Sequence, residues 1–302
     1  MLRMGTVIVC ELSHFGLIRF FGAESQSFLH NQITCDVAAL ESGKSTYGSY
    51  CNPKGRVLAT FLLWRTGDEF FMQLPSSLRE PIQKQISKYI LRAKVKVADA
   101  SPDWTLIGVV GTGAAALVQR VAGGETVIKL PGERYEIAVT RGKDQAILAA
   151  LASETEKVSP EHWDWLDIRA GVPVILPATQ EAFVPQMLNL DLIGGVSLTK
   201  GCYPGQEIVA RMHYRGTLKQ RMYLANVAAS DSPQPGDKLY SPDFGEQACG
   251  MIVNAARSPE GGSDVLAVIQ IASAEKGNVH WKSPSGPMLK LMQLPYSVSA
   301  PG

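Results

Sequence analysis

The feature that most constrains the fold is a change in the spacing of apolar residues near residue 217. Before it, short strand-like runs alternate with stretches that have the apolar spacing of amphipathic helices. After it, short apolar runs such as Met222 to Val227 and Val265 to Ile271 alternate with clusters rich in Ser, Pro and Gly. We therefore expect α+β structure first, and then a small antiparallel β-barrel in which the helices stop. A chain of 302 residues exceeds what one core usually organises, so two or three domains are expected.

The first part contains several legible elements. Polar turn residues lie at the ends of the apolar runs. Apolar residues recur about every two positions in the strand-like stretches and about every 3.6 positions in the helix-like ones. The sequence predicts strands at Gly16 to Phe20, Arg56 to Trp64, Glu69 to Leu74 and Thr105 to Val110, and helices from Gly22 through Leu29, at Ser76 to Ile90 and at Ala115 to Val121.

Residues Gly111 to Ala116 match the G-x-G-x-x-A pattern of dinucleotide-binding proteins. The segments that follow argue against that function. Thr126 to Leu130 and Arg134 to Val139 are strand-like and joined by Pro131-Gly132, so they should form a hairpin. A dinucleotide-binding unit needs a parallel crossover instead. The order strand, helix, hairpin, helix favours half of a ferredoxin-like α+β sandwich.

Charge and cysteine content exclude some classes of function. Lys and Arg number 29 and Asp and Glu number 28, so no net field attracts nucleic acid, and no direct nucleic-acid partner is expected. No apolar run is long enough to span a bilayer. The five cysteines are widely spaced and form no C-x-x-C pair, which fits free thiols in a reducing, cytoplasmic compartment. The five histidines show no paired metal-ligand spacing, so no metal site is expected.

The candidate reactive residues lie in residues 198–216. Pro204 suits the first position of a helix and Gly216 suits the position after its end. Cys202 would then lie just before a helix N-terminus, two residues from Lys200, and both features favour the reactive thiolate. The alternative, a buried cysteine that acts as a small hydrophobe, has about equal weight from local chemistry alone.

This segment also carries a resemblance to a known family. Residues 200–207 are similar to the K-G-C-Y-x-G-Q-E signature of the YgfZ-type folate-binding proteins, which are relatives of the glycine-cleavage aminomethyltransferase. Phe183 to Gln186, Cys51 to Arg56 and Leu294 to Tyr296 resemble that family too, and the similarity is weak between about Asp99 and Pro160. The signature marks these residues as candidates: Lys200 and Cys202 for the chemistry, and Gly201, Tyr203, Gly205, Gln206, Glu207 and Arg211 as the rest of the motif.

The resemblance implies a cloverleaf of three domains around an opening that binds tetrahydrofolate or a derivative of it. Two ferredoxin-like α+β domains would be followed by the small C-terminal β-barrel, in agreement with the pattern near residue 217. The first domain would be discontinuous. The expected bounds are 1–42 plus 159–218 for the first domain, 43–158 for the second and 219–302 for the barrel.

Two aromatic residues map onto family positions associated with folate. Phe15 stands where family members can carry tryptophan, and Trp163 precedes Gly171 by eight residues. Such rings could stack on a pterin or an aminobenzoate group. The alternative is that both rings pack in a core, and for Phe15 alone that alternative is favoured. Trp165 competes with Trp163, because a shift of two residues would exchange their roles.

Departures from the aminomethyltransferase relatives bear on activity. Their catalytic acidic residue has no counterpart between Gly55 and Phe61, and Arg169 stands where they carry glutamate. Glycine cleavage is therefore not expected. The resemblance implies instead a factor that works through Cys202, with iron–sulfur client proteins as partners, to assemble or repair their clusters, those of tRNA-thiolating radical enzymes included. Two alternatives stay open: a one-carbon transferase with a substrate other than glycine, and a folate-responsive binding module without catalysis.

Overall fold

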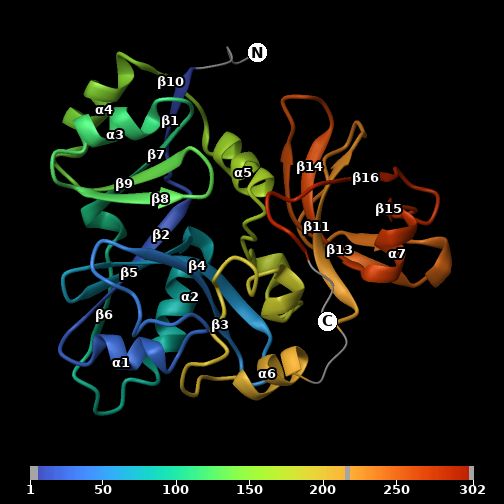
Figure 1. Ribbon diagram of the computed structural model, residues 1–302, viewed down its shortest axis with the longest axis horizontal. Helices are drawn as coiled ribbons and strands as arrows, with labels where there is room; N and C mark the ends of the chain where they lie inside the picture. Colours follow the sequence, from blue (N-terminus) through green and yellow to red (C-terminus); the bar gives the residue numbers. More distant parts are fainter. Residues whose placement is uncertain (1–5, 215–217, 299–302) are drawn as a thin grey trace. The chain divides into compact units, whose positions relative to one another are not determined.

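The computed structural model describes residues 6–214 and 218–298 and shows the expected α+β class (Figure 1). The chain forms two compact units. Their bounds differ from the expected domain bounds, and the expected domains remain a prediction. The first unit contains Met1–Leu29, Val37–Thr46 and Leu62–Trp163, and the second contains His30–Asp36, Tyr47–Phe61 and Asp164–Gly302.

One sheet of the first unit is built around the predicted hairpin. Its strands, in the order β10-β1-β7-β9-β8, are Thr155–Lys157, Val7–Glu11, Trp104–Val110, Arg134–Thr140 and Thr126–Leu130. Strand β9 pairs antiparallel with both β8 and β7, which confirms the hairpin and excludes a parallel dinucleotide-binding unit there. Helices α3 (Ala114–Val121) and α4 (Asp144–Ala152) cover one face of this sheet (Figure 1).

A second sheet has the strand order β3-β4-β5-β2-β6. The strands are Ser45–Cys51, Val57–Thr66, Glu69–Pro75, Phe15–Phe21 and Lys96–Asp99. Strands β4 and β5 pair antiparallel from Leu62 opposite Gln73 to Thr66 opposite Glu69, which confirms the predicted hairpin. Helix α1 (Ser25–His30) follows β2, and α2 (Ser76–Ser87) buries Leu78, Ile82 and Ile86. The described residues thus reproduce each predicted strand and helix of the first part, with bounds shifted by a few residues.

The C-terminal part of the second unit is an antiparallel sheet that curls into a half-barrel. Its strands, in the order β15-β12-β13-β14-β11-β16, are His280–Trp281, Lys238–Tyr240, Ala248–Arg257, Ser263–Gln270, Gln220–Val227 and Leu289–Met292. Their inward side chains form a buried core with Trp281 and Cys249. The expectation that helices stop after residue 217 is wrong, because α7 (Ile271–Lys276) follows β14 directly. Six residues are too few to display a helical period between turn clusters.

The remaining helices are α5, which spans Pro160–Arg169, and α6, which spans Gln206–Tyr214 and follows the motif cysteine. The described residues also contain short 3₁₀ turns at Ser101–Asp103, Pro177–Thr179, Pro185–Leu188 and Pro242–Phe244. The expected start of α6 at Pro204 is wrong by two residues. Gly205 has a φ of +81°, outside the helical region, and its carbonyl accepts the first helical hydrogen bond from Val209. The expected end at Gly216 lies outside the described residues.

Among the described residues, no helix is both long enough and apolar enough to cross a membrane.

Candidate functional site

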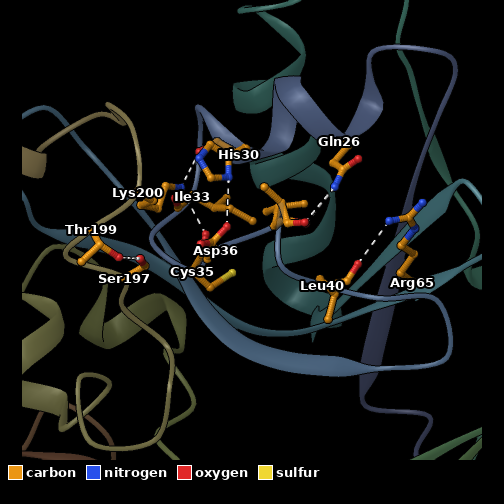
Figure 2. A network of polar contacts seen from close by, with 12 residues as sticks. Gln26, His30, Ile33, Cys35, Asp36, Leu40, Arg65, Ser197, Thr199 and Lys200 are labelled. Atoms are coloured by element: carbon orange, nitrogen blue, oxygen red, sulfur yellow. Dashed lines mark hydrogen bonds and ion pairs between the residues drawn. The ribbon is translucent and has the colours of Figure 1, made fainter.

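Lys200 anchors the start of the motif on the loop from His30 to Asp36. Its side chain is 8% exposed, and its ammonium donates hydrogen bonds to the carbonyl oxygens of His30, Ile33 and Cys35 (Figure 2). An ammonium has three N–H donors, so these carbonyls use its full capacity. Any effect of Lys200 on the Cys202 thiol is therefore an effect of charge through space and not a hydrogen bond.

The ionisable groups beside this carbonyl cage are His30 and Asp36. The imidazole Nδ1 of His30 lies 3.4 Å from the Asp36 carboxylate (Figure 2). Burial, followed by the Lys200 charge, lowers the pKa of His30. Burial also lowers the pKa of Lys200, to about 8. The cluster thus holds one buried cation against carbonyl dipoles and a nearby carboxylate.

The segment before Lys200 is fixed on the same loop by backbone contacts at Thr34. The Ser197 amide donates to the Thr34 carbonyl oxygen at 2.9 Å, and the Thr34 hydroxyl donates to the Gly195 carbonyl at 2.6 Å. The Ser49 amide in turn donates to that hydroxyl at 2.9 Å. Thr34 is fully buried, so these bonds are shielded from water. Hydrogen bonds at Gly195 and Ser197 therefore fix the chain segment that leads to Cys202.

The other side of the motif packs on the turn from Asn52 to Gly55. A Cβ placed on Gly205 would lie 2.6 Å from both the Asn52 carbonyl oxygen and the Gly55 Cα. Any side chain at residue 205 would thus collide with backbone atoms, and the φ of +81° also requires glycine. The Asn52 side-chain oxygen accepts hydrogen bonds from the amides of Lys54 and Arg56, which fixes the turn. The glycine at 205 is needed because two backbones meet there.

Cys202 is the exposed cysteine of this chain. All five cysteines lie in the described residues, and the other four are buried. Burial raises the pKa of the Cys35 and Cys51 thiols to about 12, and it raises the pKa of Cys249. Cys202 precedes the first residue of α6 by four positions, so the helix dipole, which acts within the first turn, contributes less than the sequence suggested. Exposure distinguishes Cys202 from the other thiols.

The remaining motif residues divide into buried and exposed positions. Tyr203 is 6% exposed, its hydroxyl has no hydrogen-bond partner among the described residues, and burial raises its pKa. Gln206 donates to the Lys200 carbonyl at 3.4 Å. Gly201, Glu207 and Arg211 are exposed. Tyr203 and Gln206 therefore stabilise the loop, while the exposed positions flank Cys202.

A carboxylate that the sequence did not suggest lies beside the Asn52 turn. Glu181 accepts a hydrogen bond of 3.2 Å from the Asn52 side-chain amide, and its own amide donates to the Val57 carbonyl at 2.8 Å. Its φ of +60° is uncommon for a residue with a side chain. The residues are 129 positions apart, so no local pattern could have revealed the pair. No group of three or more His, Cys, Asp or Glu suited to a metal occurs in the described residues.

The two aromatic residues assigned to folate have different surroundings within the first unit. Trp163 is 1% exposed and packs against Gly108, where a Cβ would come 2.4 Å from the indole ring. The Arg134 guanidinium lies 5.6 Å from that ring. The indole N–H of Trp163 has no partner among the described residues. Phe15, by contrast, is half-buried and lines a cavity that Trp163 does not line.

Trp165 belongs to a different environment from Trp163. Its indole N–H donates to the Asp264 carboxylate at 2.8 Å, and Asp264 also accepts from the Asn226 amide at 2.8 Å. Arg169, at the position that the resemblance matched to a glutamate of the aminomethyltransferase relatives, lies 3.5 Å from the same carboxylate. Trp165 and Arg169 thus both contact Asp264 of β14, and the choice between Trp163 and Trp165 as a folate contact stays a prediction.

Comparison with known proteins places this geometry in a family. The model of the GCVT N-terminal domain matches residues 3–130. The tRNA-modifying protein YgfZ of Escherichia coli O127:H6 is 31% identical over 95% of this chain and 92% of its own length. The chain belongs to the YgfZ family. The YgfZ protein of Vibrio atlanticus is 33% identical over 74% of this chain and 71% of its own length.

A solved structure supports the fold of this YgfZ-family chain. The aminomethyltransferase T of the glycine cleavage system of Bartonella henselae superposes with a TM-score of 0.76. It is 17% identical, and the match covers 97% of this chain and 86% of that one. The likeness confirms the expected aminomethyltransferase-type α+β architecture, with a curled antiparallel sheet at the C-terminus. At this identity the comparison concerns the fold alone.

Proposed function

We propose that this chain is a folate-binding factor that acts in tRNA modification by supporting iron–sulfur clusters in client enzymes. The relatives named for tRNA modification cover nearly the whole chain, and the GCVT N-terminal domain model matches its first part. Tetrahydrofolate or a derivative is the proposed ligand, with Phe15 and Trp163 as proposed contacts. The proposed clients include enzymes that thiolate tRNA. The proposed location is the cytoplasm, because free cysteines suit a reducing compartment.

The observation that supports a thiol mechanism is the exposure of Cys202 on a loop fixed from both sides. A thiol that exchanges with sulfur or contacts iron must be reachable by a partner protein, and the other four cysteines are buried. One cysteine cannot supply the four thiolates that usually hold a cluster. A transient role in assembly or repair therefore fits Cys202 better than storage of a cluster.

Lys200 has a proposed role as the residue that positions Cys202. Its three bonds to His30, Ile33 and Cys35 hold the chain two residues before the thiol, while Gly205 holds it three residues after. Because the loop is already fixed, it loses less conformational entropy when a partner binds. Cys202 would thus be presented to a client in one conformation.

Complementation of a deletion strain tests the proposal. Cells that lack the protein should lose activity in selected iron–sulfur enzymes, and the wild-type chain should restore it. Cys202→Ser should fail to restore it while retaining its unfolding transition and its affinity for tetrahydrofolate. Full complementation by Cys202→Ser would remove the thiol mechanism and favour a folate-responsive binding module without catalysis.

A one-carbon transferase with a substrate other than glycine is the second candidate, and one observation favours it. The Glu181 carboxylate lies on the Asn52 turn, which itself contacts Gly205 of the motif. Moving protons around a transferred carbon requires a positioned acid or base. Glu181 could be that group even though residues 55–61 contain no carboxylate. Substitution of Glu181 separates the two candidates, as argued in the Discussion.

A further inference from the structure

Residues 88–95 form the loop that joins α2 to β6 (the α2–β6 loop; Figure 1). Leu91 in this loop is 87% exposed, which makes it the most exposed large apolar residue in the described part of the chain. Tyr89, two residues earlier, is 43% exposed. Single exposed leucines are common on protein surfaces, so the exposure of Leu91 indicates a binding site only if its surroundings support one.

Backbone hydrogen bonds hold the α2–β6 loop in one conformation. Three successive amides, from residue 88 to residue 90, donate to carbonyl oxygens in the last turn of α2 at 3.1–3.3 Å. At the other end of the loop, the Glu24 amide donates to the Lys94 carbonyl at 3.2 Å, and the Glu24 carboxylate accepts from the Lys94 amide. A Cβ on Gly22 would lie 2.4 Å from the same carbonyl oxygen. Leu91 is therefore presented by a fixed backbone, and its binding to a partner would cost little conformational entropy.

The stretch that contains the loop is strongly basic. Between Glu80 and Asp99 the chain has no acidic residue and five exposed basic ones, Lys84, Lys88, Arg92, Lys94 and Lys96. Lys84 pairs with Glu80, and Lys88 donates to the neutral Gln85 side-chain oxygen at 3.0 Å. Arg92, Lys94 and Lys96 have no carboxylate partner within the ranges that the structure describes. The whole chain has a net charge of +1, so this excess of positive charge is local.

Two of these cations have roles within the fold. Lys88 directly follows α2, where a positive charge interacts favourably with the helix dipole. Lys96 lies on β6, an edge strand of the second sheet, and lysine on an edge strand opposes pairing with another chain. Neither explanation applies to Leu91 or Arg92, which lie between the two elements. An exposed leucine beside an arginine without a carboxylate partner is the observation that indicates a binding partner.

We propose that the α2–β6 loop is the surface on which a client enzyme docks, with Leu91 in an apolar pocket of the client and carboxylates around that pocket facing Arg92 and Lys94. Protein interfaces commonly have an apolar centre and a polar rim, and tyrosine and arginine are enriched in them. A protein is favoured over RNA, because phosphates would pair with the cations but leave Leu91 in water. One short loop suits a transient contact, from which each client can be released. The inference rests on the proposed function, since its partner is a client enzyme.

Complementation of the deletion strain with full-length chains tests the docking surface. The variants are Leu91→Asp and Arg92→Glu. Their matched controls are Met288→Asp and Lys129→Glu, which change an exposed apolar and an exposed basic residue outside the α2–β6 loop. Both loop side chains are exposed, so the variants should keep the unfolding transition of the wild type.

Photo-crosslinking in the same cells identifies what the loop contacts. The reactive residue p-benzoylphenylalanine replaces Tyr89, whose aromatic side chain it resembles. In the control it replaces Met288. The Tyr89 position should crosslink to an iron–sulfur enzyme whose activity the deletion lowers, and addition of Leu91→Asp should abolish that crosslink.

We expect Leu91→Asp and Arg92→Glu each to weaken association with the client at least about tenfold, since each places a carboxylate against an acidic rim. At equal expression both should restore less iron–sulfur enzyme activity than the wild type, and both controls should restore it fully. Full restoration by both loop variants, with Cys202→Ser still inactive, overturns the docking surface and leaves the proposed function intact. A deletion strain that loses no iron–sulfur enzyme activity overturns both. A crosslink from the Tyr89 position to RNA in place of protein overturns the client surface in favour of nucleic-acid binding.

Discussion

The ammonium of Lys200 donates a hydrogen bond of 3.1 Å to the carbonyl oxygen of Cys35, 165 positions earlier in the chain. The ammonium also donates to the carbonyl oxygens of His30 and Ile33. These three acceptors are peptide dipoles, so they bind the ammonium without neutralising its charge. A buried cation of this kind is stable only while its acceptors stay in place. The first lysine of the motif thus joins the cysteine loop to the His30–Asp36 loop.

Replacement of Lys200 by methionine should release the cysteine loop. The variant keeps the apolar stem but leaves three buried carbonyls without a donor, so we expect a loss of about 1–3 kcal/mol in the free energy of unfolding. Hydrogen exchange of residues 197–205 should accelerate more than that of the half-barrel. Lys200→Arg, which keeps the charge, should lose less. Equal exchange in wild type and Lys200→Met would show that the cage does not fix the loop.

The stability contributed by Lys200 should depend on pH in a defined direction. Burial lowers its pKa from 10.5 to about 8. Between these values the unfolded chain binds a proton at this residue and the folded chain does not, so folding becomes more favourable as the pH rises. The full shift corresponds to about 3 kcal/mol.

Urea denaturation of wild type and Lys200→Met at a series of pH values measures this effect. The difference in unfolding free energy between wild type and Lys200→Met should move in favour of the wild type between about pH 8 and pH 10.5, since the other titrating groups contribute equally to both proteins. A difference that moves the opposite way would mean that the carbonyl bonds outweigh the effect of burial.

Gly205→Ala should disrupt the contact between the motif and the Asn52 turn. The added methyl would lie 2.6 Å from two backbone atoms, at a φ of +81°. We expect a loss of about 2 kcal/mol or more in unfolding free energy, together with altered alkylation of Cys202. Gly201→Ala is the matched control, because the nearest atom to its Cβ would be 3.9 Å away. Equal losses in the two variants would contradict the role of the close backbone approach.

Periodicity and turn residues predicted most of the fold. The strands β4 and β5 and the hairpin of β8 and β9 were legible because polar turn residues separate runs with clear spacing. The start of α6 was misplaced, since Pro204 is an ordinary first helical residue, whereas Gly205 has a φ of +81° where it meets the Asn52 turn. Helix α7 was missed because a single short turn of helix carries no period.

The candidate site was predictable only where the motif is contiguous. Residues 200–207 were found from their signature, but the cage at Cys35 and the Glu181 carboxylate are brought to their partners by tertiary folding. Contacts over such separations leave no local pattern. Burial of Trp163 was one of two alternatives, but its packing surface, Gly108, could not be identified because glycine has no side chain that contributes to a pattern.

Trp163 can be tested as a folate contact with a conservative variant. Trp163→Ala would leave a large cavity and cost about 3–5 kcal/mol of stability, so a loss of binding in that variant would be ambiguous. Trp163→Phe keeps an aromatic face but removes the indole N–H, which has no partner among the described residues. We expect tetrahydrofolate to bind Trp163→Phe several-fold more weakly, and Trp165→Phe with nearly unchanged affinity. A larger effect at Trp165 would assign the folate contact to that residue.

The last prediction separates cluster maintenance from one-carbon transfer by comparing Glu181 with Cys202. A transferase requires an acid or base beside the transferred carbon, and Glu181 is the carboxylate on the Asn52 turn. Glu181→Gln keeps an oxygen that can accept from Asn52 but cannot move a proton. If the protein maintains clusters, Glu181→Gln should restore iron–sulfur enzyme activities in a deletion strain, and Cys202→Ser should not. Purified protein should convert neither methylene- nor formyl-tetrahydrofolate. Turnover of either compound that is lost in Glu181→Gln but kept in Cys202→Ser would establish the transferase and refute the thiol mechanism.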